Sequence, residues 1–425
     1  MTSLNLKGAG RALVAGALLG SLGAGPGHAE DVKLEVAFAV PHHRQMYDES
    51  TPLFETAHPG IKLRFLTPAV DYDALAQDTL RQSIAGSLPD VMFHGYARVK
   101  LMAERGLAVP LDDMLAADGG PEALGYAPAS LDACRYQGKL YGIPFTTSMP
   151  IVYFNADLVR KAGSDPDHLP SDWAGILELG RKIDGLDGPI QGAVFDYKGN
   201  GNWSFLALLS SLGTEPMNAQ ETRLNFDNAQ TLRALQIIHD FGRSGQVDMT
   251  RNQWRQAYAS GTLGIFVNTS SILTEYQKQI GDRLEIRTMP FPLESKDGRV
   301  PVGGACVMMF AKAPAHQRAA WNYLKFMTGP VAQTIVVKFT GYMPNNLKAL
   351  EDPTLLGEYY RDNPLQLTAV KQLPVATAWY SFPGDNGVRI SKEIEEVLNR
   401  LGTLKITPAQ AQQELIDRVS PLLPH

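Results

Sequence analysis

Apolar residues alternate with polar ones at several points in the N-terminal part of the chain, a spacing typical of β-strands. Residues 32–40 carry apolar side chains at every second position, and residues 61–65 repeat the pattern. A short apolar run at 91–93 predicts a third strand. Asp71 can cap a helix whose apolar residues, between 72 and 84, lie on one side. Strands alternating with helices in this order predict a doubly wound, mostly parallel sheet.

A second unit of the same kind is expected from about Pro144 onward. The apolar residues 151–154 predict a strand that crosses between two lobes, and further strand patterns lie at 262–267 and 284–290. Ser171 is expected to cap the helix that follows it. These elements predict a second α/β sheet.

The C-terminal part is predicted to be mainly helical. Its apolar stripe at 394–401 is followed by Gly402, while in the second unit Asp227 or Asn228 can start a helix that ends near Gly242. Thr407, followed by proline and three residues later by glutamine, forms a capping box that opens the last helix. Proline and glycine are scattered along the chain and form no flexible linker, so we expect a hinge of several strands.

The length and the order of the elements together predict a two-lobed α/β protein. The chain has 425 residues, more than one hydrophobic core usually serves. We expect the first lobe to contain residues 30–145 and 292–338, and the second lobe residues 146–291 and 339–425. Each lobe is expected to hold a doubly wound, mostly parallel sheet flanked by helices.

The first 29 residues resemble a cleaved secretory signal peptide. Lys7 and Arg11 precede an apolar run at 12–24, and small residues at Gly27 and Ala29 suit a signal peptidase. The run is short for a membrane span. We therefore expect a protein that is exported to a bacterial periplasm.

The net charge of the chain narrows the classes of partner that it can bind. Residues 1–29 contain two basic and no acidic residues, so their removal changes the net charge from −5 to −7. A negative chain without a basic tract is not expected to bind nucleic acid or anionic lipid.

Cys134 and Cys306 could form a disulfide in an oxidising compartment or remain as two buried thiols. The adjacent His42 and His43 are more typical of a loop than of a metal site, and no metal and no cofactor is expected.

Several segments, taken in order, resemble the family 1 extracellular solute-binding proteins of ABC importers. They include residues 140–163, the Pro-x-x-Trp at 170–173, the glycine pair at 303–304, the segment 340–344 and the Thr-Pro start at 407–411. The resemblance implies two lobes that close on a small ligand and then dock on an inner-membrane permease. It also implies a monomer without catalytic activity.

Within this family the likeness is greatest to members that bind glycerol 3-phosphate, through residues 145–150 and 386–389. Carried over by position, the resemblance implies these ligand-binding residues: Tyr72, Thr147 or Ser148, Thr269 or Ser270, Gly304, Tyr342 and Arg389. The carboxylate that contacts glycerol in those members has no match here, because residues 94–96 read His-Gly-Tyr.

Residue chemistry adds two candidates and keeps alternatives open. Tyr96 follows the third strand, where loops of a doubly wound sheet face a ligand. Trp203 can form a platform for a sugar or a quaternary ammonium, or simply pack in the core, and Trp379 could do the same. Arg389 can pair with a phosphate or with Asp385 or Glu393 at the surface.

We therefore expect a ligand such as glycerol 3-phosphate or a glycerophosphodiester, with a neutral mono- or oligosaccharide as the alternative. An alternative function of a different class is that of an exported phosphoester or glycoside hydrolase. The chain has no Gly-x-Ser-x-Gly elbow, no phosphate-binding P-loop and no His-Glu-x-x-His motif to favour it. A chemoreceptor partner or a ligand-free scaffold could share the same fold.

Overall fold

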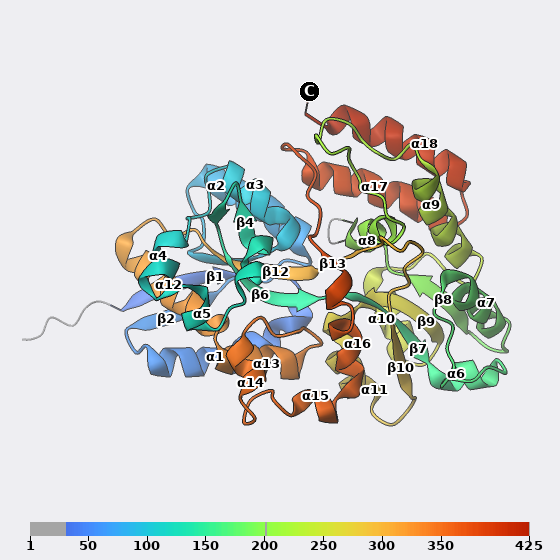
Figure 1. Ribbon diagram of the computed structural model, residues 1–425, viewed down its shortest axis with the longest axis horizontal. Coiled ribbons are helices and arrows are strands. Elements are labelled where there is room, and N and C mark those ends of the chain that lie inside the picture. Colours follow the sequence, from blue (N-terminus) through green and yellow to red (C-terminus); the bar gives the residue numbers. More distant parts are fainter. Residues whose placement is uncertain (1–30, 200–201, 425) are drawn as a thin grey trace, which may run out of the picture.

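Two β-sheets lie side by side in the computed structural model, each covered by helices (Figure 1). The structure describes residues 31–199 and 202–424, so the expected signal at 1–29 lies outside the described residues. The two-lobed, mixed α/β architecture expected from the sequence is confirmed. The lobe boundaries given above stay predictions.

The first sheet belongs to the lobe that contains the N-terminal strands. Its strand order is β2 (Ile61–Phe65), β1 (Val32–Ala37), β3 (Val91–Gly95), β12 (Gly303–Met309) and β6 (Ile143–Ser148). Its helices are α1 (Arg44–Ala57), α2 (Tyr72–Ala85), α3 (Val99–Glu104), α4 (Asp112–Ala117), α5 (Gly120–Leu124), α12 (Pro314–Met327) and α13 (Pro330–Phe339). A two-stranded ribbon, β4 (Arg135–Tyr136) and β5 (Lys139–Leu140), precedes β6. α14 (Leu347–Glu351) packs on α13, so the chain stays beside this lobe beyond residue 338.

The second sheet has the order β10 (Ile286–Pro290), β7 (Pro150–Asn155), β9 (Leu263–Thr269) and β8 (Gln191–Phe195). Its helices are α6 (Ala156–Lys161), α7 (Trp173–Asp184), α8 (Trp203–Ser211), α9 (Ala229–Gly242), α10 (Arg251–Ala259), α11 (Leu273–Ile280), α16 (Leu367–Val370), α17 (Gly387–Gly402) and α18 (Pro408–Val419). α15 (Tyr359–Asp362) lies between the lobes at the lower edge of Figure 1. Each predicted strand and helix therefore forms close to its expected residues.

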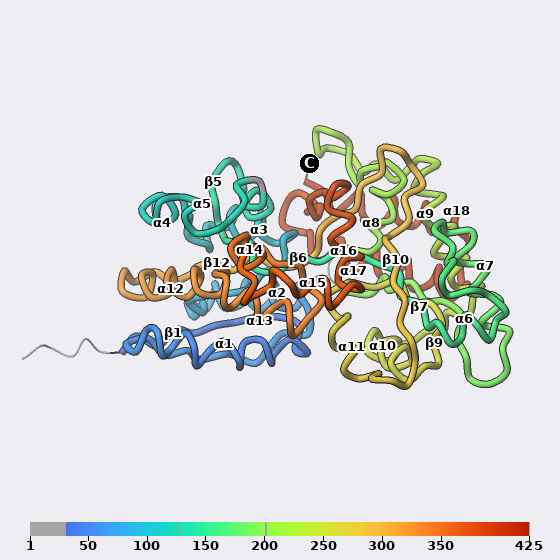
Figure 2. The backbone as a smooth tube through the Cα atoms, turned by 60° about the horizontal axis from the view of Figure 1, so that its bottom comes forward, coloured from blue at the N-terminus to red at the C-terminus, as the bar shows by residue number. Residues whose placement is uncertain are grey.

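Each sheet contains one strand that runs against the others, and in both cases it is a strand next to a crossing between lobes. β12 is antiparallel to β3 and to β6, and β7 is antiparallel to β9 and to β10. β6 leads directly into β7, and β12 carries the chain back to the first lobe, where α12 covers β1 (Figure 2). A short parallel pair, β11 (Val300–Pro301) with β13 (Ala376–Thr377), adds to this region. Several crossings thus form the hinge.

Helix caps explain where several helices begin. The Asp71 side chain accepts a hydrogen bond from the Ala74 amide at the start of α2, and Thr407 forms the expected capping box at α18. Asn228 caps α9, which settles the choice between Asp227 and Asn228. The expectation for Ser171 is wrong: Asp172 caps α7, because its carboxylate accepts from the Gly175 amide.

The two cysteines form a disulfide inside the first lobe. Cys134 and Cys306 lie 172 residues apart in sequence and 6.0 Å apart between Cα atoms. Both are fully buried. The bond ties the 3-10 helix before β4 to the reversed strand β12, two elements that the sequence alone does not bring together.

A buried histidine makes the fold sensitive to acid. His94 on β3 is fully buried, and burial together with the nearby Arg98 lowers its pKa from 6.5 to about 3. At a pH between these two pKa values, His94 binds a proton in the unfolded chain but stays neutral in the folded protein. Stability is therefore lost as pH falls below 6.5, by about 2 kcal/mol at pH 5 from this residue. We expect His94→Gln to flatten the decline of the unfolding free energy between pH 6.5 and 5, measured by urea denaturation.

His168→Gln is the matched control for this prediction. His168 is exposed, and its hydrogen bond to Asp165 raises the pKa, so its contribution has the opposite sign. An unchanged slope in His94→Gln, or the same flattening in His168→Gln, would contradict the assignment.

Candidate functional site

A cavity of about 390 Å³ lies between the two lobes. Its walls combine hydroxyl, amide, guanidinium and aromatic side chains with two glycines. The lining residues are Val40, Pro41, His42, Val70, Tyr72, Ser148, Trp203, Arg251, Asn252, Arg255, Gln256, Thr269, Ser271, Glu275, Tyr276, Gln279, Gly303, Gly304, Tyr342 and Trp379. Such a lining can hold a small polar ligand through many hydrogen bonds.

The hydroxyl groups of the cavity come from strand ends and from the start of a helix. Ser148 ends β6, and Thr269 ends β9 and donates its hydroxyl to Ser271 at 3.0 Å. Tyr72 is the first residue of α2, and Tyr342 follows α13. These side chains lie beyond the carboxyl ends of strands, which is where α/β proteins bind their ligands.

Three aromatic rings form one wall, which we call the aromatic wall: Tyr72, Trp203 and Trp379. The ring centroids of Trp203 and Trp379 are 6.1 Å apart, and those of Tyr72 and Trp379 are 6.3 Å apart. The Trp203 indole nitrogen donates to the carbonyl oxygen of Pro301 at 3.1 Å. A Cβ at Gly303 would lie 2.7 Å from the Trp203 ring, so only glycine lets the indole lie this close to β12.

Two arginines from α10, Arg251 and Arg255, also line the cavity. Arg251 donates to the buried carboxylate of Asp196 at 2.7 Å. Arg255 lies one turn further along the helix, and its Nη1 contacts Nδ1 of His42 at 3.4 Å. Because His42 precedes α1, this contact joins the second lobe to the first.

Burial keeps the ionisable hydroxyls of the cavity protonated. Burial raises the pKa of Tyr72 and of Tyr342, so both phenols remain hydrogen-bond donors at neutral pH. Burial also raises the pKa of Glu275, while Arg255 and a hydrogen bond from Gln279 oppose that shift. Tyr72 and Tyr342 therefore supply donors to the site, and Glu275 is the one carboxyl group in its lining.

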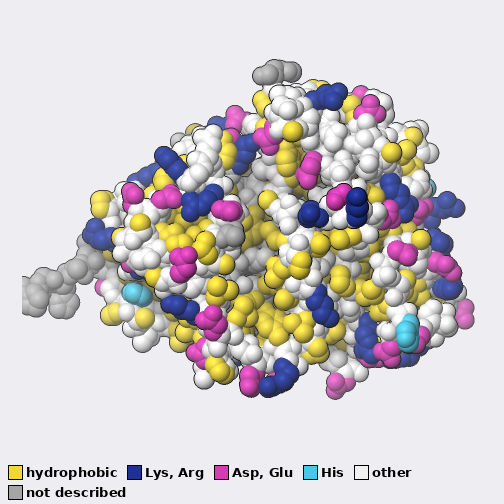
Figure 3. All heavy atoms as spheres, viewed as in Figure 1, with side chains coloured by type: hydrophobic (Ala, Val, Ile, Leu, Met, Phe, Trp, Pro, Cys, Tyr) yellow, Lys and Arg dark blue, Asp and Glu magenta, His cyan; other side chains and the backbone are white. Residues whose placement is uncertain are grey.

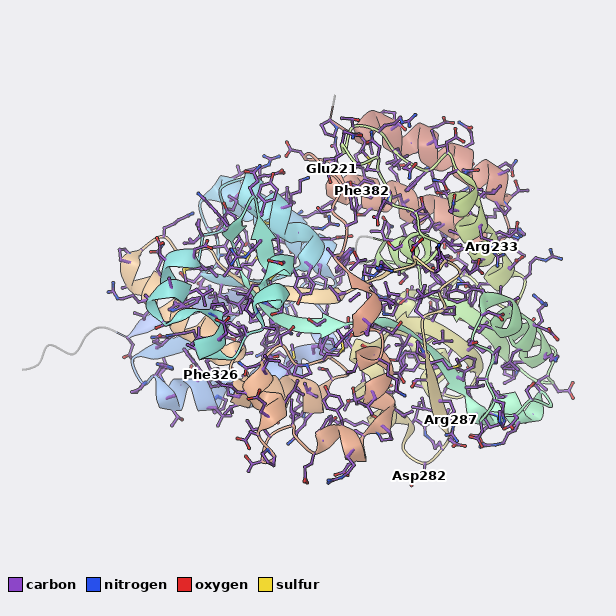
Figure 4. All side chains as sticks on the ribbon, in the orientation of Figure 1. Glu221, Arg233, Asp282, Arg287, Phe326 and Phe382 are labelled. Carbon is purple, nitrogen blue, oxygen red and sulfur yellow. A yellow bond between two sulfur atoms is a disulfide. The ribbon has the colours of Figure 1, made fainter. Side chains whose placement is uncertain are left out.

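Other polar contacts hold the two lobes together near the cavity. Lys100 on α3 forms an ion pair of 3.0 Å with Glu221, which lies at the upper end of the interlobe region in Figure 4. Arg98 on the first lobe donates to the Ser391 hydroxyl on α17 at 3.3 Å. The lobes thus contact each other around the cavity in this structure.

Six of the ten site residues expected from the sequence line the cavity. They are Tyr72, Ser148, Trp203, Thr269, Gly304 and Tyr342. The structure does not bring Tyr96, Thr147, Ser270 or Arg389 to the cavity wall.

The four others have different surroundings. Thr147 and Ser148 point to opposite faces of β6, and the Thr147 hydroxyl donates to Asn345 at 2.7 Å. The Tyr96 hydroxyl donates to the Thr146 carbonyl at 2.9 Å. Ser270 is buried, and its oxygen accepts from the Met149 amide at 3.3 Å. Arg389 lies exposed on α17.

Sequence reasoning missed the cavity residues of α10 and α11. Arg251 and Arg255 stand four positions apart, so they share one helix face, while Trp254 and Tyr258 pack inward. This spacing was visible in the sequence. The direction in which that face points depends on how α10 packs, which the sequence pattern does not specify.

On the face shown in Figure 3, acidic and basic side chains are interspersed. Within the described part of the chain, no cluster of three or more His, Cys, Asp or Glu side chains could hold a metal ion. The same residues include no helix long and apolar enough to cross a membrane.

Two α/β lobes around a polar cavity are typical of proteins that bind small solutes. Residues 53–364 match the bacterial extracellular solute-binding protein family, and the chain belongs to this family. The expected resemblance is thereby confirmed. Members of this family bind small ligands and deliver them to ABC permeases.

Named relatives and solved structures agree with this assignment. The sn-glycerol-3-phosphate-binding periplasmic protein UgpB of Escherichia coli K12 is 23% identical over 304 residues, covering 67% of this chain and 68% of that protein. UgpB of Mycobacterium tuberculosis in complex with glycerophosphocholine superposes with a TM-score of 0.81 at 21% identity, covering 92% and 98% of the two chains. A solute-binding protein of Thermotoga lettingae bound to α-D-tagatose has a TM-score of 0.79 at 18% identity, with coverage of 92% and 100%. At this level of identity the structures show a shared fold.

Proposed function

We propose that this protein is the periplasmic substrate-binding component of an ABC importer and that its ligand is glycerol 3-phosphate or a glycerophosphodiester. The observation that carries the proposal is the polar cavity lined from both lobes by hydroxyls, two arginines and three aromatic rings. The names of the UgpB relatives and the glycerophosphocholine in one neighbouring structure support the same ligand class.

In the proposed function, the protein binds its ligand and does not catalyse a reaction of it. The ligand enters between the lobes, hinge closure surrounds it, and the closed monomer docks on an inner-membrane permease. Export through the signal at residues 1–29 would place the protein where such a permease receives its cargo.

A neutral sugar is the second candidate. The aromatic wall offers flat apolar surface for a sugar ring, and Gln256 and Glu275 supply amide and carboxyl groups for hydroxyls. Several solved structures with the same fold contain sugars or polyols, among them the tagatose complex.

A thermal-shift screen of residues 30–425 tests the proposal. We expect glycerol 3-phosphate or glycerophosphocholine to raise the melting temperature in a concentration-dependent way, because a ligand that binds only the folded state stabilises it. The panel also contains glycerol, maltose and mannitol. A rise with a neutral sugar alone would replace the phosphate ligand, and a panel without any effect would contradict the proposal. Hydrolysis of a phosphoester or glycoside during the assay would favour an enzyme instead.

A further inference from the structure

Among the described residues, Arg255 beside the cavity forms no direct ion pair with a carboxylate, and this observation deepens the function proposed above. We infer that Arg255, supported by His42 and Tyr276, forms the subsite that receives the oxyanion of the ligand. In this arrangement the polyol part of the ligand lies toward the aromatic wall. The inference rests on the proposed function, and it differs from the sequence-based expectation that Arg389 holds the anion.

The first observation is that Arg255 makes no direct ion pair, although Asp196 and Glu275 act on it from a longer distance. Within residues 31–199 and 202–424, no carboxylate oxygen lies within 4 Å of its guanidinium, whereas Arg251 is paired with Asp196. The Nε of Arg255 is buried and has no hydrogen-bond partner there. A partly buried guanidinium that has an unused donor and contacts no carboxylate is costly, so an anion that enters the cavity would be bound favourably.

The second observation is the protonation state of His42. A guanidinium has only donors, so the Nδ1 that faces Arg255 must accept, and the proton of the neutral ring therefore lies on Nε2. This Nε2 is buried and has no partner among the described residues. Burial, the neighbouring His43, Arg255 and Arg251 all keep the ring neutral. His42 thus adds an unused donor from the first lobe.

The third observation is the hydroxyl of Tyr276 on α11. The side chain is buried and lines the cavity, yet its hydroxyl has no partner among the described residues. Together, Arg255, His42 and Tyr276 leave donors from both lobes without acceptors on one side of the cavity. Glu275 is the one carboxyl group in the lining, and it accepts a hydrogen bond from Gln279 at 2.9 Å.

An oxyanion is the chemical group that matches unused donors beside a positive charge. A phosphate ester or a carboxylate could supply it. A phosphate offers more acceptor oxygens, and contacts from both lobes would couple anion binding to lobe closure. The aromatic wall then remains for the carbon skeleton and hydroxyls of the ligand.

Isothermal titration calorimetry of the purified protein tests this assignment. The variants are Arg255→Gln, Arg389→Gln and, as a matched control, Arg243→Gln, which removes an exposed arginine of the same lobe outside the cavity. The titrants are glycerol 3-phosphate, glycerophosphocholine, glycerate, glycerol and maltose. We expect Arg255→Gln to weaken glycerol 3-phosphate roughly 10- to 100-fold, with less than a twofold change in the other two variants.

The ligand arms separate the sources of the anion. Tight binding of the phosphate compounds and weak binding of glycerate would identify a phosphate site, and the reverse a carboxylate site. Both results support the subsite if Arg255→Gln abolishes the preference over glycerol. If Arg255→Gln does not fold, Arg255→Lys keeps the charge without the planar donor group and is expected to lose about 3- to 10-fold.

Other outcomes overturn the inference. Unchanged affinity in Arg255→Gln together with a loss in Arg389→Gln would move the anion to α17. Equal affinity of the wild type for glycerol, or tight binding of maltose alone, would leave a solute-binding protein without an oxyanion subsite. If no titrant binds the wild type, the ligand class proposed above fails as well.

Discussion

A variant carrying Cys134→Ala and Cys306→Ala is expected to lose about 3–5 kcal/mol of unfolding free energy, measured by urea denaturation. The bond closes a loop across a sequence separation of 172 residues. A cross-link over so long a segment removes much of the freedom of the unfolded chain. Alanine is the appropriate replacement because both side chains are buried, where a serine hydroxyl would need a partner.

Reduction provides the control for this prediction. A reducing agent should destabilise the wild type to nearly the level of the double variant and leave the variant itself unchanged. Ligand affinity should stay the same at temperatures where both proteins are folded, because neither cysteine lines the cavity. Equal stability of the oxidised wild type and the variant would show that the bond contributes no net stability.

Gly304→Ala is expected to cost about 3 kcal/mol or more and to weaken ligand binding. The backbone of Gly304 has a φ of 124°, which side-chain-bearing residues rarely adopt. A Cβ at this position would also overlap the carbonyl oxygen of Thr146 on the neighbouring strand β6. Relief of that overlap must shift β12 relative to β6, and Gly304 itself lines the cavity.

Gly86→Ala separates the two causes. Gly86 also has a positive φ, 68°, but a Cβ there would meet no atom within 4 Å. Its cost is expected to be about 1 kcal/mol, from backbone conformation alone. Urea denaturation and calorimetry with glycerol 3-phosphate measure both variants. Similar stability losses, or unchanged affinity in Gly304→Ala, would contradict the argument.

The sequence predicted the elements well because each depends on short-range pattern. Alternation at residues 32–36 and 61–65 corresponds to β1 and β2, and Thr407 caps α18. The buried residues of α17 recur every three or four positions, as its amphipathic pattern predicts. Where neighbouring residues compete for one local role, as Ser171 and Asp172 do at α7, the pattern was insufficient.

Site residues were predicted less well, since neighbouring positions face opposite ways. Ser148 lines the cavity, while Thr147 bonds Asn345. Likewise Ser271 reaches the cavity and Ser270 is buried against the hinge. A choice between adjacent residues depends on strand register and local twist, which require the three-dimensional structure.

By itself, the sequence determined the α/β class, the two lobes, the family and most of the helix caps, because these follow from periodicity, end signals and ordered motifs. Only the tertiary structure decided that Cys134 pairs with Cys306 and that Arg255, not the exposed Arg389, lies beside the cavity. Both outcomes depend on how distant segments pack. Residues 42 and 255 meet across the lobes, and no local pattern carries that information.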